Sequence, residues 1–273
     1  MDLQKELNIA KQLAREAGKI ALEKQSKLIV KQKPLGQGPV SNADQIIDDF
    51  ISQELKKFFP KDQIISEESY QEETVNKLGR VWFVDPIDGT ASYIAGLDDF
   101  VIMIGLMING KTSLGVIYQP TSGIMWSALS NGENRECVRE HGNKQKIITP
   151  GHWAKNNHQL RIITSRTFRS NRQEQFIKTI DPSLIIRRGS FGLKAMLVLD
   201  GVADIYLCWS KRIKLWDSCA PHAIIQAAGG CMVHLDNSPL DFKDGINHQR
   251  SILISSHKLE DSLMLLLRNI EQG

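Results

Sequence analysis

The sequence predicts an α/β protein, and two observations lead to that fold class. In the first half, two amphipathic helical segments precede short apolar segments separated by turn residues, which is typical of an antiparallel meander. In the second half, strand-like and helix-like segments alternate, which indicates helices layered against a sheet. We therefore expect an N-terminal α+β part over residues 1–150 and a C-terminal α/β part over residues 151–273.

The first two helices are separated by a basic segment. Leucine, isoleucine and alanine recur at helical spacing between residues 3 and 24. The segment 25–39 is rich in Lys, Gly and Pro, and we interpret it as a strand fragment followed by either a surface loop or a lid near an anionic site. The second helix begins at Ser41 and Asp44, which have capping-box spacing, and Pro60 ends it.

The middle of the chain predicts a sheet. A short apolar strand ends at Glu67 and Glu68, and a longer one covers residues 82–88. Three further strands are expected, separated by Asn-Gly and Ser-Gly turns, at 101–106, 112–118 and 124–129. The polar segment 131–157 is expected to contain the boundary between the two parts.

The second half alternates between the two kinds of element. Strands are expected at 160–164, 184–187, 203–207, 231–235 and 251–255. Helices are expected at 171–180, 191–199, 220–228 and 259–270.

Composition excludes several classes of protein. The net charge of +3 over 273 residues gives no reason to expect nucleic acid as a partner. No apolar run approaches the roughly 20 residues of a membrane helix, and the charge-rich N-terminus differs from a signal peptide. The four cysteines show no CxxC spacing, which favours reduced thiols and a cytoplasmic location over disulfides or a zinc site.

Acidic residues stand where the central strand is expected to end. Asp85 and Asp88 flank Pro86, which fixes φ, and Gly89-Thr90 follows. Two carboxylates held by such a turn can converge on a hard divalent cation, and the glycine lets backbone N–H groups approach an anion. A metal beside a phosphate site is one interpretation, and a strand end with Asp-Gly turn chemistry is the other.

Three further acidic positions admit the same two interpretations. Glu67 and Glu68 repel each other unless both are solvated or a cation lies between them. Asp217 lies near the start of an expected helix, where it is either an N-cap or a ligand. Taken together, these carboxylates lie where α/β layers place their ligand sites.

The combination of these motifs resembles a known family. The Glu67-Glu68 pair, the segment Asp85-Pro86-Ile87-Asp88-Gly89-Thr90 and the distant Trp216-Asp217 resemble the magnesium-dependent, lithium-sensitive phosphatases typified by inositol monophosphatase. The resemblance spans nearly the whole chain and implies a layered α/β/α/β/α sandwich, the sugar phosphatase fold. It also implies two or three Mg²⁺ ions, a small-molecule phosphate ester as substrate, and a monomer or homodimer.

Within this family, the 3′(2′),5′-bisphosphate nucleotidases are the most similar group. The segments Gly189–Lys194, Thr164–Arg166 and Trp216–Pro221 resemble their motifs. Inositol monophosphatases carry a glutamate seven residues before the last metal aspartate, where this chain has Ser210. The resemblance thus implies hydrolysis of the 3′-phosphate of adenosine 3′,5′-bisphosphate, a by-product of sulfate activation, to leave AMP. The alternatives are an inositol 1-phosphate or related sugar phosphate phosphatase, and a catalytically silent protein that senses nucleotide or metal.

The resemblance also assigns roles to individual residues. The implied metal ligands are Glu67, Asp85, the Ile87 carbonyl, Asp88 and Asp217, with Glu68 beside them through a water. Thr90 and Asp44 are implied to orient the attacking water, since a hydroxyl that donates to a carboxylate is a better acceptor for a water proton. The implied substrate contacts are Gly89, Thr90, Ser190 and Lys194, although a solvated helix lysine is the alternative for Lys194.

Overall fold

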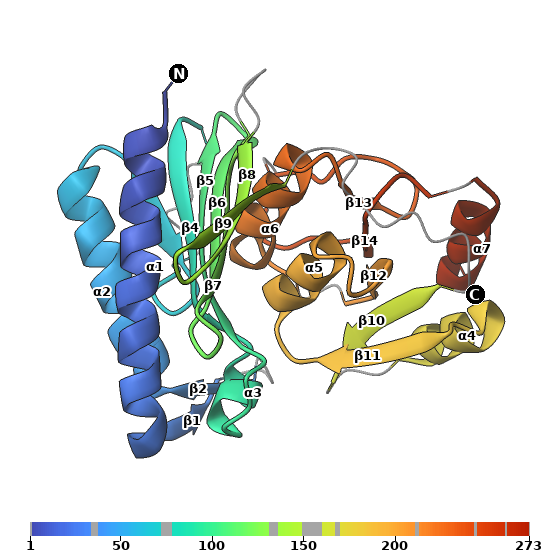
Figure 1. Ribbon diagram of the computed structural model, residues 1–273, viewed down its shortest axis with the longest axis horizontal. Helices are drawn as coiled ribbons and strands as arrows, with labels where there is room; N and C mark the ends of the chain where they lie inside the picture. Colours follow the sequence, from blue (N-terminus) through green and yellow to red (C-terminus); the bar gives the residue numbers. More distant parts are fainter. Residues whose placement is uncertain are drawn as a thin grey trace.

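The computed structural model describes residues 2–33, 38–71, 78–130, 136–148, 160–166, 170–210, 213–242, 245–259 and 261–272. The helices lie in three layers, with a sheet between each pair of layers (Figure 1). The outer layer of the N-terminal half contains α1 (Gln4–Lys24) and α2 (Asn42–Phe58). The central layer contains α5 (Phe191–Leu199) and α6 (Leu215–Ala227), and the last contains α4 (Asn171–Ile180) and α7 (Asp261–Gln272). The predicted α/β/α/β/α sandwich is confirmed.

The N-terminal sheet has seven strands in nearly sequential order. Its strands are β3 (Gln63–Ser66), β4 (Arg80–Asp88), β5 (Val101–Ile108), β6 (Lys111–Gln119), β7 (Ile124–Leu129), β8 (Glu136–His141) and β9 (Lys144–Ile148). The first two strands run parallel, and every later pair is antiparallel, as the predicted meander requires. A short hairpin of β1 (Val30–Gln32) and β2 (Pro39–Ser41) precedes α2.

The hairpin of β8 and β9 corrects the prediction of a polar connection over residues 131–157. Both strands extend the sheet, and β9 forms its edge. Charged and polar side chains such as Lys144, Gln145 and Lys146 are exposed on β9. Charged side chains are common on edge strands because they oppose further strand pairing, so the hairpin lacks the apolar alternation of a buried strand.

The C-terminal sheet has the strand order β11-β10-β12-β14-β13. Its strands are β10 (Arg161–Ser165), β11 (Leu184–Arg188), β12 (Ile205–Cys208), β13 (Cys231–His234) and β14 (Ile252–Ser255). The first three run parallel, and β14 is antiparallel to both of its neighbours. The carboxyl ends of β10 and β11 point toward the short helix α3 (Thr90–Ile94) of the N-terminal half (Figure 1).

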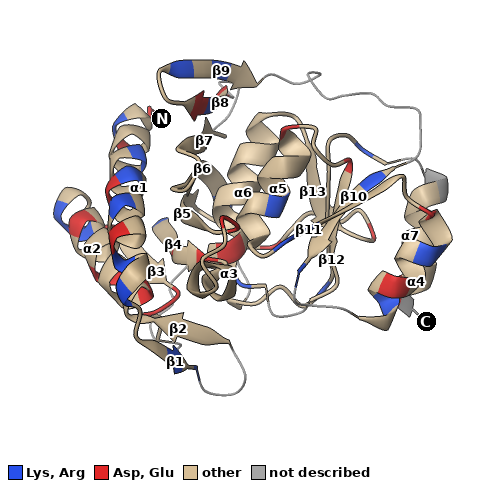
Figure 2. Cartoon of the chain, turned by 60° about the horizontal axis from the view of Figure 1, so that its bottom comes forward, with Lys and Arg blue, Asp and Glu red and all other residues tan. Residues whose placement is uncertain are grey.

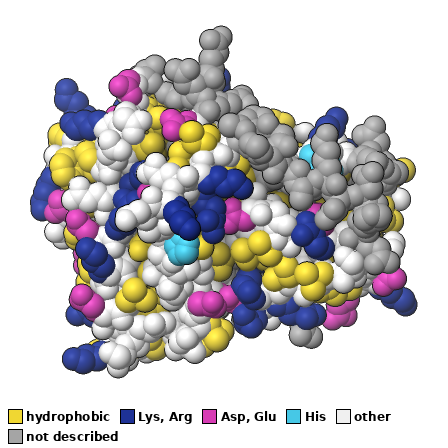
Figure 3. Space-filling view, viewed as in Figure 1, with side chains coloured by type: hydrophobic (Ala, Val, Ile, Leu, Met, Phe, Trp, Pro, Cys, Tyr) yellow, Lys and Arg dark blue, Asp and Glu magenta, His cyan; other side chains and the backbone are white. Residues whose placement is uncertain are grey.

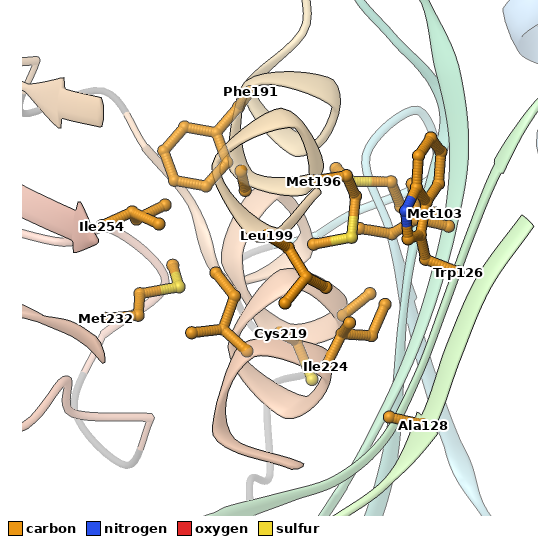
Figure 4. Close-up of a cluster of buried hydrophobic side chains, with 14 of the residues drawn as sticks. Met103, Trp126, Ala128, Phe191, Met196, Leu199, Cys219, Ile224, Met232 and Ile254 are labelled. Carbon is orange, nitrogen blue, oxygen red and sulfur yellow. The ribbon is translucent and has the colours of Figure 1, made fainter. Parts of the chain in front are cut away.

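The hydrophobic core between the sheets fixes the position of α6. Met103 and Trp126 of the N-terminal sheet face α5 and α6, and Met232 and Ile254 lie on the other side of these helices (Figure 4). Gly115 of β6 allows a close approach, because a Cβ there would lie 2.3 Å from the carbonyl oxygen of Ala220 in α6. This core contains residues from both predicted parts. The division near residue 150 stays a prediction.

Helix α6 begins at Leu215, five residues before the predicted start at Ala220. In the structure Pro221 lies inside the helix and Asp217 lies in its first turn. The residues before Pro221 are thus helical, and Asp217 is held by helical backbone rather than by a preceding loop.

Two further observations concern helix hydropathy and surface charge. In the part of the chain that the structure describes, no helix is both long enough and apolar enough to cross a membrane. Basic and acidic side chains are interspersed over the described part of the face in Figure 3, without a continuous basic surface there.

Candidate active site

The parallel pairing of β3 and β4 places three acidic residues together. Ser66 is paired with Val84, so that Glu67 and Asp85 follow at the same edge of the sheet. The Glu67 N–H donates to the carbonyl oxygen of Val84 at 3.1 Å, which continues the pairing by one residue. Parallel strands thus bring the Glu67-Glu68 pair beside Asp85, although Glu68 and Asp85 are 17 positions apart in the chain.

Asp88 is bound by a turn of the C-terminal half. Its carboxylate accepts hydrogen bonds from the Ser190 hydroxyl at 2.5 Å, the Phe191 N–H at 2.9 Å and the Gly192 N–H at 2.6 Å. These donors stand at the start of α5, where backbone N–H groups lack helical partners. The orientation of Asp88 therefore depends on both halves of the molecule.

Asp217 completes a cluster of three buried or half-buried carboxylates. One of its oxygens accepts a hydrogen bond from the Lys214 backbone N–H at 2.6 Å, which holds the carboxylate against the start of α6. Among the described residues, Asp85, Asp88 and Asp217 each offer an oxygen, and these oxygens lie within 4.8 Å of one another. The N-cap interpretation of Asp217 is wrong, because Lys214 is the N-cap of α6 and Asp217 is the third residue of the helix. Its carboxylate lies in the cluster, and its role as a metal ligand stays a prediction. Figure 2 shows acidic segments gathered beside α3.

The carboxylates raise one another's pKa values. Burial is the largest cause of the raised pKa of Asp85, and the charges of Glu67, Asp88 and Asp217 add to it. The pKa of Asp217 is raised by burial and then by Glu67 and Asp88. Burial also raises the pKa of Asp88, despite the opposing effects of the Lys194 charge and of the hydrogen bonds from Ser190 and α5. A bound cation offsets this repulsion and stabilises the ionised forms.

Lys33 forms ion pairs with both residues of the glutamate pair. Its Nζ lies 2.7 Å from Glu67 Oε1 and 2.5 Å from Glu68 Oε1. Burial lowers the pKa of Lys33, but the two glutamates raise it more, and the net pKa is above its usual value. Burial and then the Glu67 charge raise the pKa of Glu68 to about 7. The basic segment 25–39 therefore reaches the acidic site, and its residues 34–37 lie outside the described structure.

Asp44 and Thr90 form the predicted pair. The Thr90 hydroxyl lies 2.9 Å from Asp44 Oδ1 and 3.0 Å from the Ile87 carbonyl oxygen. Asp44 Oδ2 accepts from the N–H and hydroxyl of Ser41, so the capping box that was the alternative interpretation is also present. Burial raises the pKa of Asp44 despite these hydrogen bonds.

Gly89 connects the carboxylates to α3. Its φ of 100° lies in the left-handed region, and a Cβ there would lie 2.6 Å from the carbonyl oxygen of Asp99. Only glycine meets both conditions without strain. Gly89 and Thr90 therefore stand at the start of α3 as the sequence predicted, and binding of a phosphate by their N–H groups stays a prediction.

Ser190 and Lys194 have defined positions in the structure. The Ser190 hydroxyl donates to Asp88 and accepts from the Leu193 N–H. Lys194 is only 2% exposed, and its Nζ donates to the carbonyl oxygens of Gly189 and Ser190 at 2.9 and 2.5 Å. Burial lowers the pKa of Lys194 to about 8. A solvated helix lysine is therefore the wrong interpretation, and substrate contact by either residue stays a prediction.

The sequence analysis did not identify two buried aspartates that lie near the site. Asp48 is fully buried on α2 and accepts from the hydroxyl of Ser66, the residue before Glu67. Its position one helical turn after Asp44 is the only available hint. Asp99 is fully buried and binds residues of the C-terminal half, which a pattern along the chain does not reveal.

Comparisons with known proteins identify the family of this chain. The model of the inositol monophosphatase family matches residues 2–272. The 3′(2′),5′-bisphosphate nucleotidase CysQ of Buchnera aphidicola is 32% identical over 80% of this chain and 80% of its own length. Inositol monophosphatase 1 of Bos taurus is 26% identical over 92% of this chain and 90% of its own length.

A solved structure shows the same fold. The IMPase of Thermotoga maritima superposes with a TM-score of 0.82 at 22% identity and covers 98% of this chain and 99% of its own. Members of the matching family are generally dependent on divalent metals, in keeping with the acidic cluster. The chain belongs to the inositol monophosphatase family and is a phosphatase of that superfamily.

Proposed function

We propose that this phosphatase is an Mg²⁺-dependent phosphomonoesterase that removes the 3′-phosphate of adenosine 3′,5′-bisphosphate. The observation that carries the proposal is the cluster of Asp85, Asp88 and Asp217 beside the Asp44–Thr90 pair. Water attacks phosphorus, the bond from phosphorus to the ribose 3′-oxygen breaks, and that oxygen takes up a proton. The products are AMP and inorganic phosphate.

The residues present fit divalent cations such as Mg²⁺. All predicted ligands are oxygen atoms, which Mg²⁺ prefers. Asp85 Oδ1 is buried and accepts no hydrogen bond from the described residues. Such an oxygen is costly to bury unless it has a partner, and a cation supplies one. Asp85, Asp88 and Asp217 are the residues that would hold it, with Glu67 and the Ile87 carbonyl as further proposed ligands.

A bound cation would lower the pKa of a coordinated water and offset charge on the phosphate. The residues of this chain have two further tasks. Asp44 accepts a hydrogen bond from the Thr90 hydroxyl, and the Thr90 oxygen in turn is proposed to accept a hydrogen bond from the attacking water. The Gly89 and Thr90 N–H groups, at the start of α3, are the proposed donors to phosphate oxygens. Glu68 lies beside Glu67 and is proposed to act through a water.

The names of relatives and the residue at position 210 support the nucleotide as substrate. The Buchnera relative is named a bisphosphate nucleotidase, while the bovine relative at lower identity is named an inositol monophosphatase. Ser210 stands where the resemblance places a glutamate that holds inositol hydroxyls. Ser190 and Lys194 shape the turn beside Asp88 and are the proposed contacts for the rest of the nucleotide. The inositol or sugar phosphate activity is the alternative.

Removal of the metal tests the proposal. EDTA followed by desalting should abolish phosphate release from adenosine 3′,5′-bisphosphate, and added Mg²⁺ should restore it, because the crowded carboxylates need cations to stay ionised together. Inhibition of the restored activity by Li⁺ is also expected. Full activity after exhaustive chelation would refute the metal mechanism, and no phosphate release under any condition would favour a silent sensor.

A further inference from the structure

A buried aspartate outside the metal cluster joins the two halves of the molecule. The Asp99 carboxylate is 1% exposed and precedes β5 in the N-terminal half. It accepts from Arg166 Nε at 3.0 Å and from the Gly189 N–H at 3.2 Å, and its other oxygen lies 3.2 Å from Arg188 Nε. All three partners belong to the C-terminal half, where they follow or end β10 and β11.

The backbone of Asp99 also lies against both turns of the site. A Cβ added to Gly89 would lie 2.6 Å from the Asp99 carbonyl oxygen, and one added to Gly189 would lie 3.4 Å from it. Gly89 directly follows Asp88, and Gly189 begins the turn whose donors bind Asp88. Asp99 therefore contacts the segment that carries Asp88 and the segment that orients it.

Arg166 and Arg188 connect Asp99 to the end of the C-terminal sheet. The Arg166 N–H donates to the Arg188 carbonyl oxygen at 2.9 Å, which extends the pairing of β10 and β11 toward Gly189. Their side chains are 39% and 40% exposed, while the Asp99 carboxylate between them is buried. A buried carboxylate is retained only where donors and opposite charges compensate its desolvation.

We propose that Asp99 is a positioning residue which, through Arg166 and Arg188, sets the Gly189–Gly192 turn and thereby the orientation of Asp88 toward a bound cation. The inference rests on the proposed metal-dependent function and assigns a residue that orients a ligand of that site. Residues that orient metal ligands from outside typically contribute about 10- to 100-fold to metal affinity or activity.

The sign of one substitution separates positioning from simple electrostatics. Arg166→Ala removes a positive charge near the metal cluster, and the electric field alone would then make Mg²⁺ bind more tightly. If the arginine instead holds the turn, its loss loosens Asp88 and makes Mg²⁺ bind more weakly. Arg166→Lys keeps the charge but loses the fork of donors that binds Asp99, so its effect should be intermediate.

Arg161→Ala supplies the matched control. Arg161 is the first residue of β10, and its guanidinium binds both oxygens of Asp204 at 3.0 and 2.7 Å. This substitution removes an arginine–aspartate pair from the same strand at the end away from Asp99. It should change stability without changing Mg²⁺ affinity.

Isothermal titration of the metal-free full chain with Mg²⁺, beside thermal melts and steady-state kinetics, gives the answer. We expect Arg166→Ala to raise the Mg²⁺ dissociation constant about 10-fold and to lower kcat more than it changes KM. Arg161→Ala should leave both the Mg²⁺ dissociation constant and kcat unchanged. A dissociation constant for Arg166→Ala at or below that of the unsubstituted chain would overturn the inference alone. Absence of Mg²⁺ binding by the unsubstituted chain would instead refute the proposed function on which it rests.

Discussion

Substitution of the Asp44–Thr90 pair tests how water is activated. Thr90→Ala removes the hydroxyl that lies 2.9 Å from Asp44 and 3.0 Å from the Ile87 carbonyl oxygen. Asp44→Asn keeps one oxygen for the capping box with Ser41 and turns an amide N–H₂ toward Thr90. The Thr90 hydroxyl can then donate only to Ile87, and its oxygen becomes a poorer acceptor for a water proton.

The structure separates the rate effect from the stability effect. General acid–base roles contribute on the order of 10²-fold or more, which corresponds to about 2.7 kcal/mol in the activation barrier. Asn caps a helix about as well as Asp, and Thr90 is only half-buried, so each variant should lose no more than about 1 kcal/mol of folding stability. Because the two side chains share one hydrogen bond, the double variant should be little slower than either single variant.

Phosphate release at saturating substrate and Mg²⁺, together with thermal melts, measures both quantities. Thr90→Ser is the control, because it keeps the hydroxyl and should retain most of kcat. A kcat for Asp44→Asn within about twofold of the unsubstituted enzyme would show that Asp44 is only a helix cap, since that is well below the effect of an acid–base group. Multiplicative losses in the double variant would show that the two residues act separately.

Two further expectations concern the carboxylates. Asp217→Asn keeps an acceptor for the Lys214 N–H but removes a charge, so calorimetry should show weaker Mg²⁺ binding with little change in the metal-free melting temperature. A large fall in the melting temperature of the metal-free protein, with unchanged Mg²⁺ affinity, would contradict this expectation. Because the folded chain raises the pKa of Glu68 from 4.5 to about 7 and that of Asp85 well above its usual value, it holds protons that the unfolded chain has released. The contribution of these groups to the stability of the metal-free protein should therefore fall as the pH rises from about 5 to 8, and the melting temperature should decline with it. Saturating Mg²⁺ should remove this decline. A melting temperature of the metal-free protein that rises over the same pH range would contradict the raised pKa values of these carboxylates.

Local patterns along the chain were sufficient for the layers and for the acidic strand ends. The period of α1 and α2, the Asn-Gly turn before β6 and the apolar run of β4 each depend on neighbouring residues only. The convergence of Asp85, Asp88 and Asp217 was predictable because strand ends and helix starts meet at one edge of an α/β layer.

Features that depend on distant contacts were not predictable in this way. Asp99 has no motif around it, and its partners lie 67 to 90 residues further along the chain. The early start of α6 is accompanied by the hydrogen bond from the Lys214 N–H to Asp217 and by close packing of the helix against the N-terminal sheet, and neither contact can be read from neighbouring residues. The position of Lys33 between the two glutamates likewise requires the fold.

A comparison of two substrates tests the proposed nucleotidase activity most directly. Purified enzyme with Mg²⁺ is assayed for phosphate release from adenosine 3′,5′-bisphosphate and from inositol 1-phosphate under the same conditions. Because Ser210 lacks the carboxylate that would accept inositol hydroxyls, kcat/KM for the nucleotide should be at least about 10-fold higher, or roughly 1.4 kcal/mol of transition-state binding. An equal or higher kcat/KM for inositol 1-phosphate would contradict the nucleotidase proposal.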